Sequence, residues 1–257
     1  GGINMLFEEE KAKKLLYYGS TIDTVRQLLG NQRVIEERTY KYAQTRIFSR
    51  MTLSMCEILV LASNGYPNGA FSLSRQVYEG LVIMDYLREH SCDKDLIERF
   101  FDSSSIASLR LLRQAKVDGQ QSTQIEDEQL GDYSKKYTSF CNKDGVFRDY
   151  WWAGKDFSFT KLSNQTRFKS NYMYKYSCEI THMSFLNSFL HLGNQENDIL
   201  IGQSEDGYNI PLWFAMICFA DAMNIFSKVI DENWNEVIGK AEKCIKYFSP
   251  DATHNDT

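Results

Sequence analysis

Proline and glycine are scarce in this chain of 257 residues, which has three prolines and 15 glycines. Average usage of about 5% would give roughly a dozen prolines. Because both residues interrupt regular helices, their scarcity favours a helical fold and excludes collagen-like and low-complexity chains. Charged residues make up 25% of the chain and aromatic residues 14%, which is typical of a protein with a folded core.

Closely spaced cysteines and long uninterrupted apolar runs are also missing. The six cysteines form no CxxC pair, which is typical of reduced thiols and predicts a cytoplasmic protein. No basic-then-apolar leader opens the chain. The most apolar long segment, from Pro211 to Ile230, is interrupted by Asp221 and Lys228, so we expect a buried helix and no membrane partner.

Several catalytic and binding motifs are absent. No glycine-rich phosphate loop, HExxH, GxSxG or zinc-type Cys/His spacing occurs. These absences argue against P-loop hydrolases, Rossmann dehydrogenases, zincins and α/β-hydrolases, and we expect no cofactor. The net charge of −5 argues against binding of nucleic acid through the charge of the whole protein, and it predicts no DNA partner. It does not exclude a local basic patch that binds RNA.

The hydrophobic pattern predicts an all-α fold: a single-domain helical bundle over residues 1–248 with about seven main helices, followed by a polar tail over residues 249–257. Between residues 142 and 171 the helical pattern breaks. We expect an irregular, tryptophan-containing excursion there, with one short helix near residues 159–164. The expected main helices cover residues 7–29, 33–63, 67–90, 93–116, 169–192, 212–230 and 232–247, and a moderate helix covers residues 126–140.

Arg75 and Glu79 lie one helical turn apart, and the same strip continues into apolar residues. The pair therefore looks partly buried. Arg before Glu is the weaker order for a surface ion pair, and buried charges must be paired but also mark functional sites. Two interpretations stay open, a packing ion pair and a catalytic one.

His182 is the second candidate catalytic residue, with Ser177 and Tyr176 one to two turns before it. Nearby hydroxyl groups can orient an imidazole for acid–base chemistry, but a satisfied core histidine fits as well. Glu179 and His182 also form half of a di-iron bundle motif. No second Glu-x-x-His occurs, so we predict no metal site.

Tyr176 and two further groups are candidates for substrate binding. Arg46 and Arg50 lie one turn apart and form either a phosphate-contacting stripe or a solvated helix face neutralised by glutamates such as Glu57. Trp152 and Lys155 lie in the sequence Tyr-Trp-Trp-Ala-Gly-Lys. The tryptophan either stacks on a nucleic-acid base or packs at the edge of the hydrophobic core.

Taken together, the segment from Arg50 to Phe189 resembles a bacterial family of unknown function, DUF5677. The resemblance rests on Ala70, Leu73, Arg75, Tyr78 and Glu79, then on Trp152 and Gly154, and finally on Tyr176, Ser177 and His182. This family implies no established activity.

A second resemblance is to the helical ribonucleases of the HEPN superfamily, which carry Arg-x4–6-His on one helix and act as dimers. Ser177-x4-His182 has this spacing, with serine in place of arginine, and Arg75 from another helix would supply the cation. The resemblance implies metal-independent RNA cleavage in a toxin or antiviral role, and a homodimer. The alternative is a non-catalytic module for interaction or ligand sensing, in which the polar residues Arg75, Glu79, Ser177 and His182 only lock the bundle.

Overall fold

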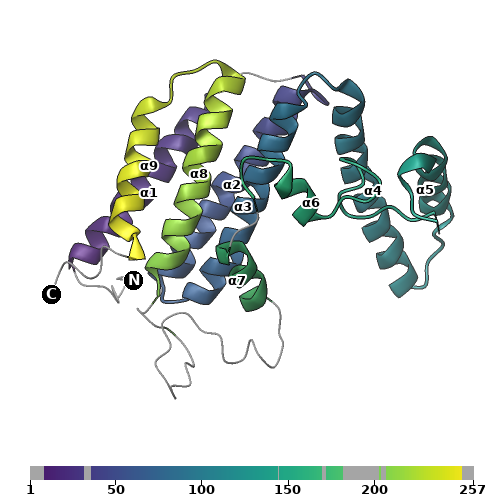
Figure 1. The fold of residues 1–257 in the computed structure, drawn as a ribbon. Helices are drawn as coiled ribbons and strands as arrows, with labels where there is room; N and C mark the ends of the chain where they lie inside the picture. The colour runs from purple at the N-terminus through teal and green to yellow at the C-terminus, as the bar shows by residue number, and fades with distance from the viewer. Residues whose placement is uncertain are drawn as a thin grey trace. The chain divides into compact units, whose positions relative to one another are not determined.

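The computed structural model describes residues 9–31, 36–143, 145–169, 172–181, 203 and 207–250. Within these ranges the chain forms nine α-helices and one 3-10 turn and contains no strand, which confirms the all-α prediction (Figure 1). The sequence predicts one domain over residues 1–248, and the contacts divide the chain into two compact units. The first unit comprises Gly1–Ile35, Gln44–Met84 and Ser170–Thr257, and the second comprises Glu36–Ala43 and Asp85–Lys169.

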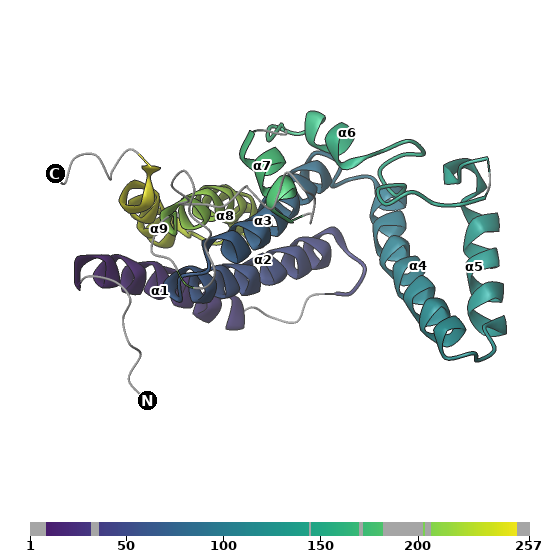
Figure 2. The same ribbon diagram turned by 90° about the horizontal axis from the view of Figure 1, so that it is seen from below.

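The first unit is a helical bundle whose main helices lie side by side in two views (Figures 1 and 2). The helices are α1 (Glu9–Gly30), α2 (Tyr40–Ser63), α3 (Pro67–Glu89), α7 (Tyr172–Thr181), α8 (Asn209–Ile230) and α9 (Asn235–Phe248). The ends of α2 and α3 extend beyond the boundaries of this unit. Proline opens α3 at its first position, where the missing N–H costs nothing.

The apolar helix α8 forms the core of the first unit. Its length and a mean hydropathy of 1.5 suit a membrane span, but 67% of that stretch is buried in the protein. Phe48 of α2 stacks on Phe219 and Phe226 of α8, with ring centroids 5.1 and 4.5 Å apart. Each such buried ring contributes about 1.5–3 kcal/mol. This burial is what a core helix requires, as the sequence predicts.

Two contacts set the spacing of the helices around α8. A Cβ on Gly80 of α3 would lie 2.7 Å from the Cγ atom of Met51, so any larger residue would force the Met51 side chain of α2 to shift. The buried hydroxyl of Tyr18 in α1 donates a hydrogen bond to the carbonyl oxygen of Leu212 at 3.2 Å. Residues from the two ends of the sequence thus meet in one core.

The second unit contains a helical hairpin and the irregular excursion. Its helices are α4 (Lys94–Asp118), α5 (Gln124–Lys136), the 3-10 turn η1 (Thr138–Phe140) and α6 (Phe159–Asn164). The hairpin consists of α4 and α5, which pack against each other (Figure 2). The short helix predicted near residues 159–164 is confirmed with those bounds.

The two tryptophans of the excursion are 2–3% exposed and fill the core of the second unit. Trp151 packs on Phe147 with ring centroids 4.5 Å apart, and Trp152 packs on Phe100 at 5.0 Å. A Cβ on Gly154 would lie 2.6 Å from the Phe157 ring, so any larger residue in the turn after the tryptophans would displace that ring. Both indole rings therefore pack in the core, which agrees with the packing interpretation of the Tyr-Trp-Trp segment.

Two predicted helix boundaries are wrong. The second helix begins at Tyr40 and not at residue 33, because Arg38 has a positive φ of 61° and the Thr39 hydroxyl caps the Tyr42 N–H. The predicted helix over residues 126–140 is α5 followed by η1, since the helical hydrogen bonding ends at Tyr137. The tail after residue 250 and the residues 182–192 of the predicted helix over 169–192 lie outside the described residues.

Candidate functional site

Arg75 and Glu79 face the same side of α3 and form a partly buried ion pair. The Nε atom of Arg75 donates a hydrogen bond to Oε1 of Glu79 at 2.7 Å, and the two side chains are 27% and 22% exposed. Within the described part of the chain, the terminal nitrogens of Arg75 make no hydrogen bond. The two terminal nitrogens of the guanidinium can therefore bind an anion through two parallel hydrogen bonds.

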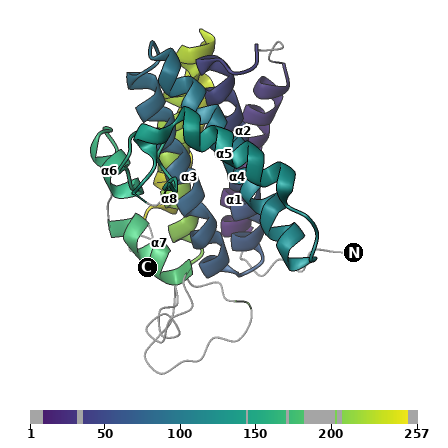
Figure 3. The ribbon, with the colours of Figure 1, turned by 90° about the vertical axis from the view of Figure 1, so that its right-hand side faces the viewer.

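Tyr174 of α7 completes this site, which we call the Arg75 cluster: Arg75, Glu79 and Tyr174. The Tyr174 hydroxyl donates to Oε1 of Glu79 at 3.3 Å, and Cζ of Arg75 lies 5.8 Å from the centre of the Tyr174 ring. Tyr78 also packs on Tyr174, with ring centroids 5.0 Å apart. The helix α7 thus lies beside the N-terminal half of α3 (Figures 1 and 3), as the partly buried charges predict.

The electrostatics keep Arg75 and Tyr174 protonated. Burial on its own would lower the pKa of Arg75, but the hydrogen bond and the charge of Glu79 outweigh it and raise that pKa. Burial, followed by the negative charge of Glu79, raises the pKa of Tyr174 well above its usual value. Arg75 is therefore a fixed cation and Tyr174 a hydrogen-bond donor at neutral pH.

The predicted catalytic residue Ser177 is fully buried in α7. Its hydroxyl donates to the carbonyl oxygen of Tyr174 at 2.7 Å, and the Thr181 hydroxyl donates to the carbonyl of Ser177 at 2.7 Å. Ser177 thus has no exposed surface in the described structure, and its hydroxyl is bound to its own helix.

His182 lies outside the described residues, directly after the end of α7 as described. Tyr176, predicted to bind substrate, is partly buried. Its ring packs on Phe71 of α3 and stacks on Tyr172, with centroid distances of 5.6 and 5.8 Å. Burial raises its pKa. Tyr176 therefore helps to join α7 to α3.

Arg46 and Arg50 are both exposed on α2. The Nη2 atom of Arg50 donates to Oε1 of Gln76 at 3.4 Å, and Gln76 directly follows Arg75 in α3. Neither arginine forms an ion pair with a residue that the structure describes, so Glu57 does not neutralise them there. They provide exposed positive charge on α2, which contacts α3 through Arg50 and Gln76.

The remaining two predicted residues belong to the second unit. Trp152 is 3% exposed and its rings are covered by Phe100 and Tyr86, with centroid distances of 5.0 and 5.8 Å. Its indole therefore has no open face on which a base can stack. Lys155 is exposed.

The sequence prediction omits Tyr174 as a site residue. The sequence contains a signal for it, because residues 174, 178 and 182 have the spacing of four that places side chains on one strip of a predicted helix. No group of three or more His, Cys, Asp or Glu side chains capable of holding a metal ion occurs among the described residues.

A protein-family model matches part of this chain. The sequence model described as "Family of unknown function (DUF5677)" matches residues 41–199, more than half of the chain. No curated protein and no solved structure matches in the comparisons made. The matched range includes both α3 and α7, which supply the Arg75 cluster.

Proposed function

The chain belongs to the DUF5677 family, and from that premise we propose that it is a metal-independent endoribonuclease whose phosphate-binding group is Arg75. RNA is then its partner, and the cytoplasm its location. The substrate class follows from the chemistry of a fixed, forked cation, which recognises a phosphodiester with two parallel hydrogen bonds.

A single observation carries this proposal: Arg75 is oriented by Glu79 through Nε and leaves its terminal nitrogens without a hydrogen bond to the described residues. An arginine that served only to lock the bundle would be expected to have those donors paired. Preorganised donors stabilise the negative charge that develops on a phosphate during cleavage. Glu79 and Tyr174 are positioning residues in this scheme.

In the proposed reaction His182 is the general acid or base, and Arg75 stabilises the charge on the phosphorane-like transition state. The attacking group is the 2′-hydroxyl of the RNA, which loses its proton as the bond from phosphorus to the 5′-oxygen breaks and that oxygen gains a proton. Arg46, exposed on α2, binds the flanking backbone. Ser177, which is buried, keeps a structural role in α7.

The test is cleavage of a fluorescently labelled single-stranded RNA in the presence of a chelator. We expect His182→Ala to lower the rate by about 100- to 10,000-fold. Arg75→Lys should also lose activity, because a point charge does not replace the forked guanidinium. The matched control is Arg26→Lys, whose arginine is exposed on α1 and pairs only with Asp23 in the described structure.

Circular dichroism spectra that match the wild type must accompany each loss of activity. Equal residual cleavage by wild type and His182→Ala would show contamination and overturn the proposal. The second candidate function, a non-catalytic module, would then stand. It is favoured by the buried Ser177 and by the way Tyr174 of α7 bonds to Glu79 of α3.

We further propose that the protein forms a homodimer through the outer face of α2. This face exposes 49% of Leu53 and 59% of Val60, with Arg50 one turn before Leu53 and Glu57 one turn after it. If two copies of α2 pair antiparallel about Leu53, Arg50 of each copy faces Glu57 of the other. Such a self-complementary pattern suits a two-fold interface.

A further inference from the structure

The α4–α5 hairpin of the second unit is held together by ion pairs at both ends. Near its turn, Lys116 contacts Oε1 of Glu126 at 2.7 Å. In the same region, Arg113 contacts Asp127 at 2.6 Å. These contacts fix the end of the hairpin where the chain reverses.

At the other end, the buried carboxylate of Asp102 accepts three hydrogen bonds. Arg38 donates at 2.7 Å, Lys136 at 3.0 Å and the Tyr137 hydroxyl at 2.6 Å. Lys136 also contacts Glu98 at 2.6 Å. Both ends of the hairpin are thus fixed, and each cation there has a carboxylate partner.

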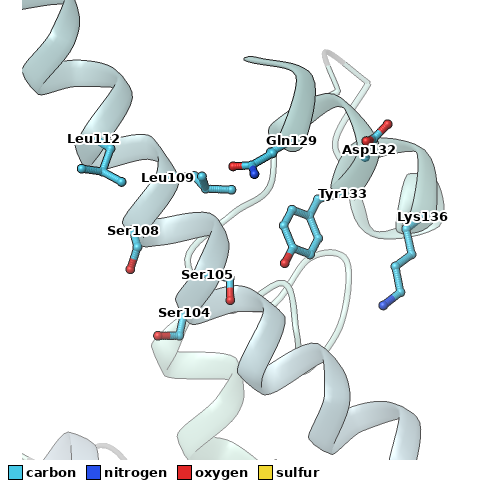
Figure 4. A pocket seen from close by; sticks show the side chains of 9 residues that line it. All are labelled: Ser104, Ser105, Ser108, Leu109, Leu112, Gln129, Asp132, Tyr133 and Lys136. Atoms are coloured by element: carbon cyan, nitrogen blue, oxygen red, sulfur yellow. The ribbon is translucent and has the colours of Figure 1, made fainter. Parts of the chain in front are cut away.

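Between these ends the two helices do not fill the space. A cleft of about 560 Å³ lies there, within the size range of small-molecule sites (Figure 4). Figure 4 shows Tyr133 and Gln129 pointing from α5 toward α4, and Leu109 pointing back toward α5. We call this space the hairpin cleft.

Four polar side chains that line the hairpin cleft have no hydrogen-bond partners in the described structure. This is true of the hydroxyls of Ser105, Ser108 and Tyr133 and of the amide of Gln129, which come from both helices. Antiparallel helices normally bury apolar side chains against each other, whereas here unpaired donors and acceptors face the cleft. Such convergent polar groups beside an apolar wall are typical of a ligand site.

The chemistry of the cleft selects a flat, uncharged ligand. The charged groups at its edge are neutralised by one another: Lys136 by Glu98 and Asp102, and Asp132 by Lys135 at 3.2 Å. The Tyr133 ring offers a stacking surface. A Gln amide presents a donor next to an acceptor, as a base edge requires. We propose that the hairpin cleft binds a nucleobase, presented either by a free nucleoside or by a single strand.

This proposal is independent of the ribonuclease proposal and uses none of the residues of the Arg75 cluster. Isothermal titration calorimetry with adenosine, methyl riboside and a tetra-adenylate single strand tests it on the full chain. Binding of adenosine without binding of methyl riboside supports base recognition from a free nucleoside. Binding of the single strand alone supports a strand as the source. Binding of methyl riboside as tightly as adenosine, or no binding by any probe, overturns the proposal.

Tyr133→Leu assigns the binding to this cleft. We expect it to weaken binding roughly 5- to 150-fold, which is the effect of losing one stacked base contact. Gln129→Leu is the second variant, at an exposed position where loss of folding is not expected, and it should weaken binding at least about fivefold by removing the contact to the base edge. Tyr66→Leu removes a 45% exposed tyrosine elsewhere and is the matched control.

Unchanged binding in both Tyr133→Leu and Gln129→Leu would overturn the assignment. Arg75→Lys should leave adenosine binding intact whether or not it abolishes RNA cleavage. If Arg75→Lys removed adenosine binding, the hairpin cleft would not be the site. Failure of the ribonuclease proposal would therefore leave the nucleobase proposal intact, and the reverse also holds.

Discussion

Asp85, whose side chain is completely buried, binds both the backbone and the guanidinium of Arg167, a residue 82 positions later. The backbone N–H of Arg167 donates to Oδ2 at 3.0 Å, and its Nη2 donates to Oδ1 at 3.0 Å. Arg88 donates to the same Oδ1 at 2.8 Å. This carboxylate therefore anchors the end of the irregular excursion to α3 within the second unit.

We predict that Asp85→Ala destabilises the protein by about 2 kcal/mol, because it leaves the N–H and the guanidinium of Arg167 without their acceptor and leaves Arg88 with only Glu89. Arg167 is 60% exposed, and this solvent access keeps the loss below that of a fully buried pair. The measurement is the urea unfolding midpoint. Asp23→Ala, at an exposed ion pair of α1, is the control, and an equal shift in both variants would contradict the anchoring role.

Stability should fall in acid through Asp102. Burial on its own would raise the pKa of this carboxyl, but hydrogen bonds from Tyr137, Arg38 and Lys136 outweigh it and lower the pKa. The folded pKa is thus below the unfolded value of about 3.9. The stabilisation is fully present above that pH and is lost as the pH falls through the folded pKa.

Asp102→Asn should therefore reduce the free energy of unfolding at pH 7, and its difference from wild type should shrink as the pH falls below about 4. Urea unfolding at a series of pH values measures this. Asp156→Asn, at an exposed position with no hydrogen bond in the described part of the chain, is the control. If the difference in free energy of unfolding between Asp102→Asn and wild type stayed constant down to acidic pH, the three donors would not stabilise the charged carboxylate.

Gly80→Ala should destabilise by about 1–3 kcal/mol, since the added Cβ would overpack against buried Met51. Gly239→Ala in α9 should instead stabilise by about 0.5–1 kcal/mol, because its Cβ would meet nothing within 4 Å. Thermal unfolding measures both changes: the melting temperature should fall for Gly80→Ala and rise for Gly239→Ala. If Gly80→Ala still destabilised equally in a Met51→Ala background, the close helix contact would not be the cause.

The proposed α2 dimer predicts that Leu53→Asp shifts the protein to monomers in sedimentation equilibrium. Arg50→Glu should weaken association, and adding Glu57→Arg should restore it. Leu111→Asp, at a position 74% exposed on α4, is the matched control and should leave the dimer intact. A wild-type chain that stays monomeric at high concentration would refute the interface.

Local signals in the sequence predict much of the fold. Pro67 and Ser158 mark helix starts, because proline suits the first turn and the Ser158 side chain caps the Lys161 N–H. The second helix was predicted to begin too early because nothing in the local sequence requires the positive φ of Arg38. Glu126 is only 6% exposed, although glutamate is usually a surface residue, and its partner is Lys116 of the facing helix α4.

The partners of the candidate site depend on contacts between distant residues. The ion pair of Arg75 and Glu79 follows from their spacing in one helix, and the structure contains it. Tyr174 joins them from a helix 95 residues away, and Asp102 gains Arg38 across 64 residues. Helix periodicity defines which face is buried but carries no information about which distant side chain meets it.

The hydrogen bond from Tyr18 to Leu212 has a consequence for the order in which the chain can fold. Its partners are 194 residues apart, so α1 cannot complete its packing during synthesis until α8 has left the ribosome. The second unit, whose residues 85–169 are continuous, can be complete before that point. The α4–α5 hairpin then forms early from contacts near in sequence, whereas the core around α8 closes last and slowly.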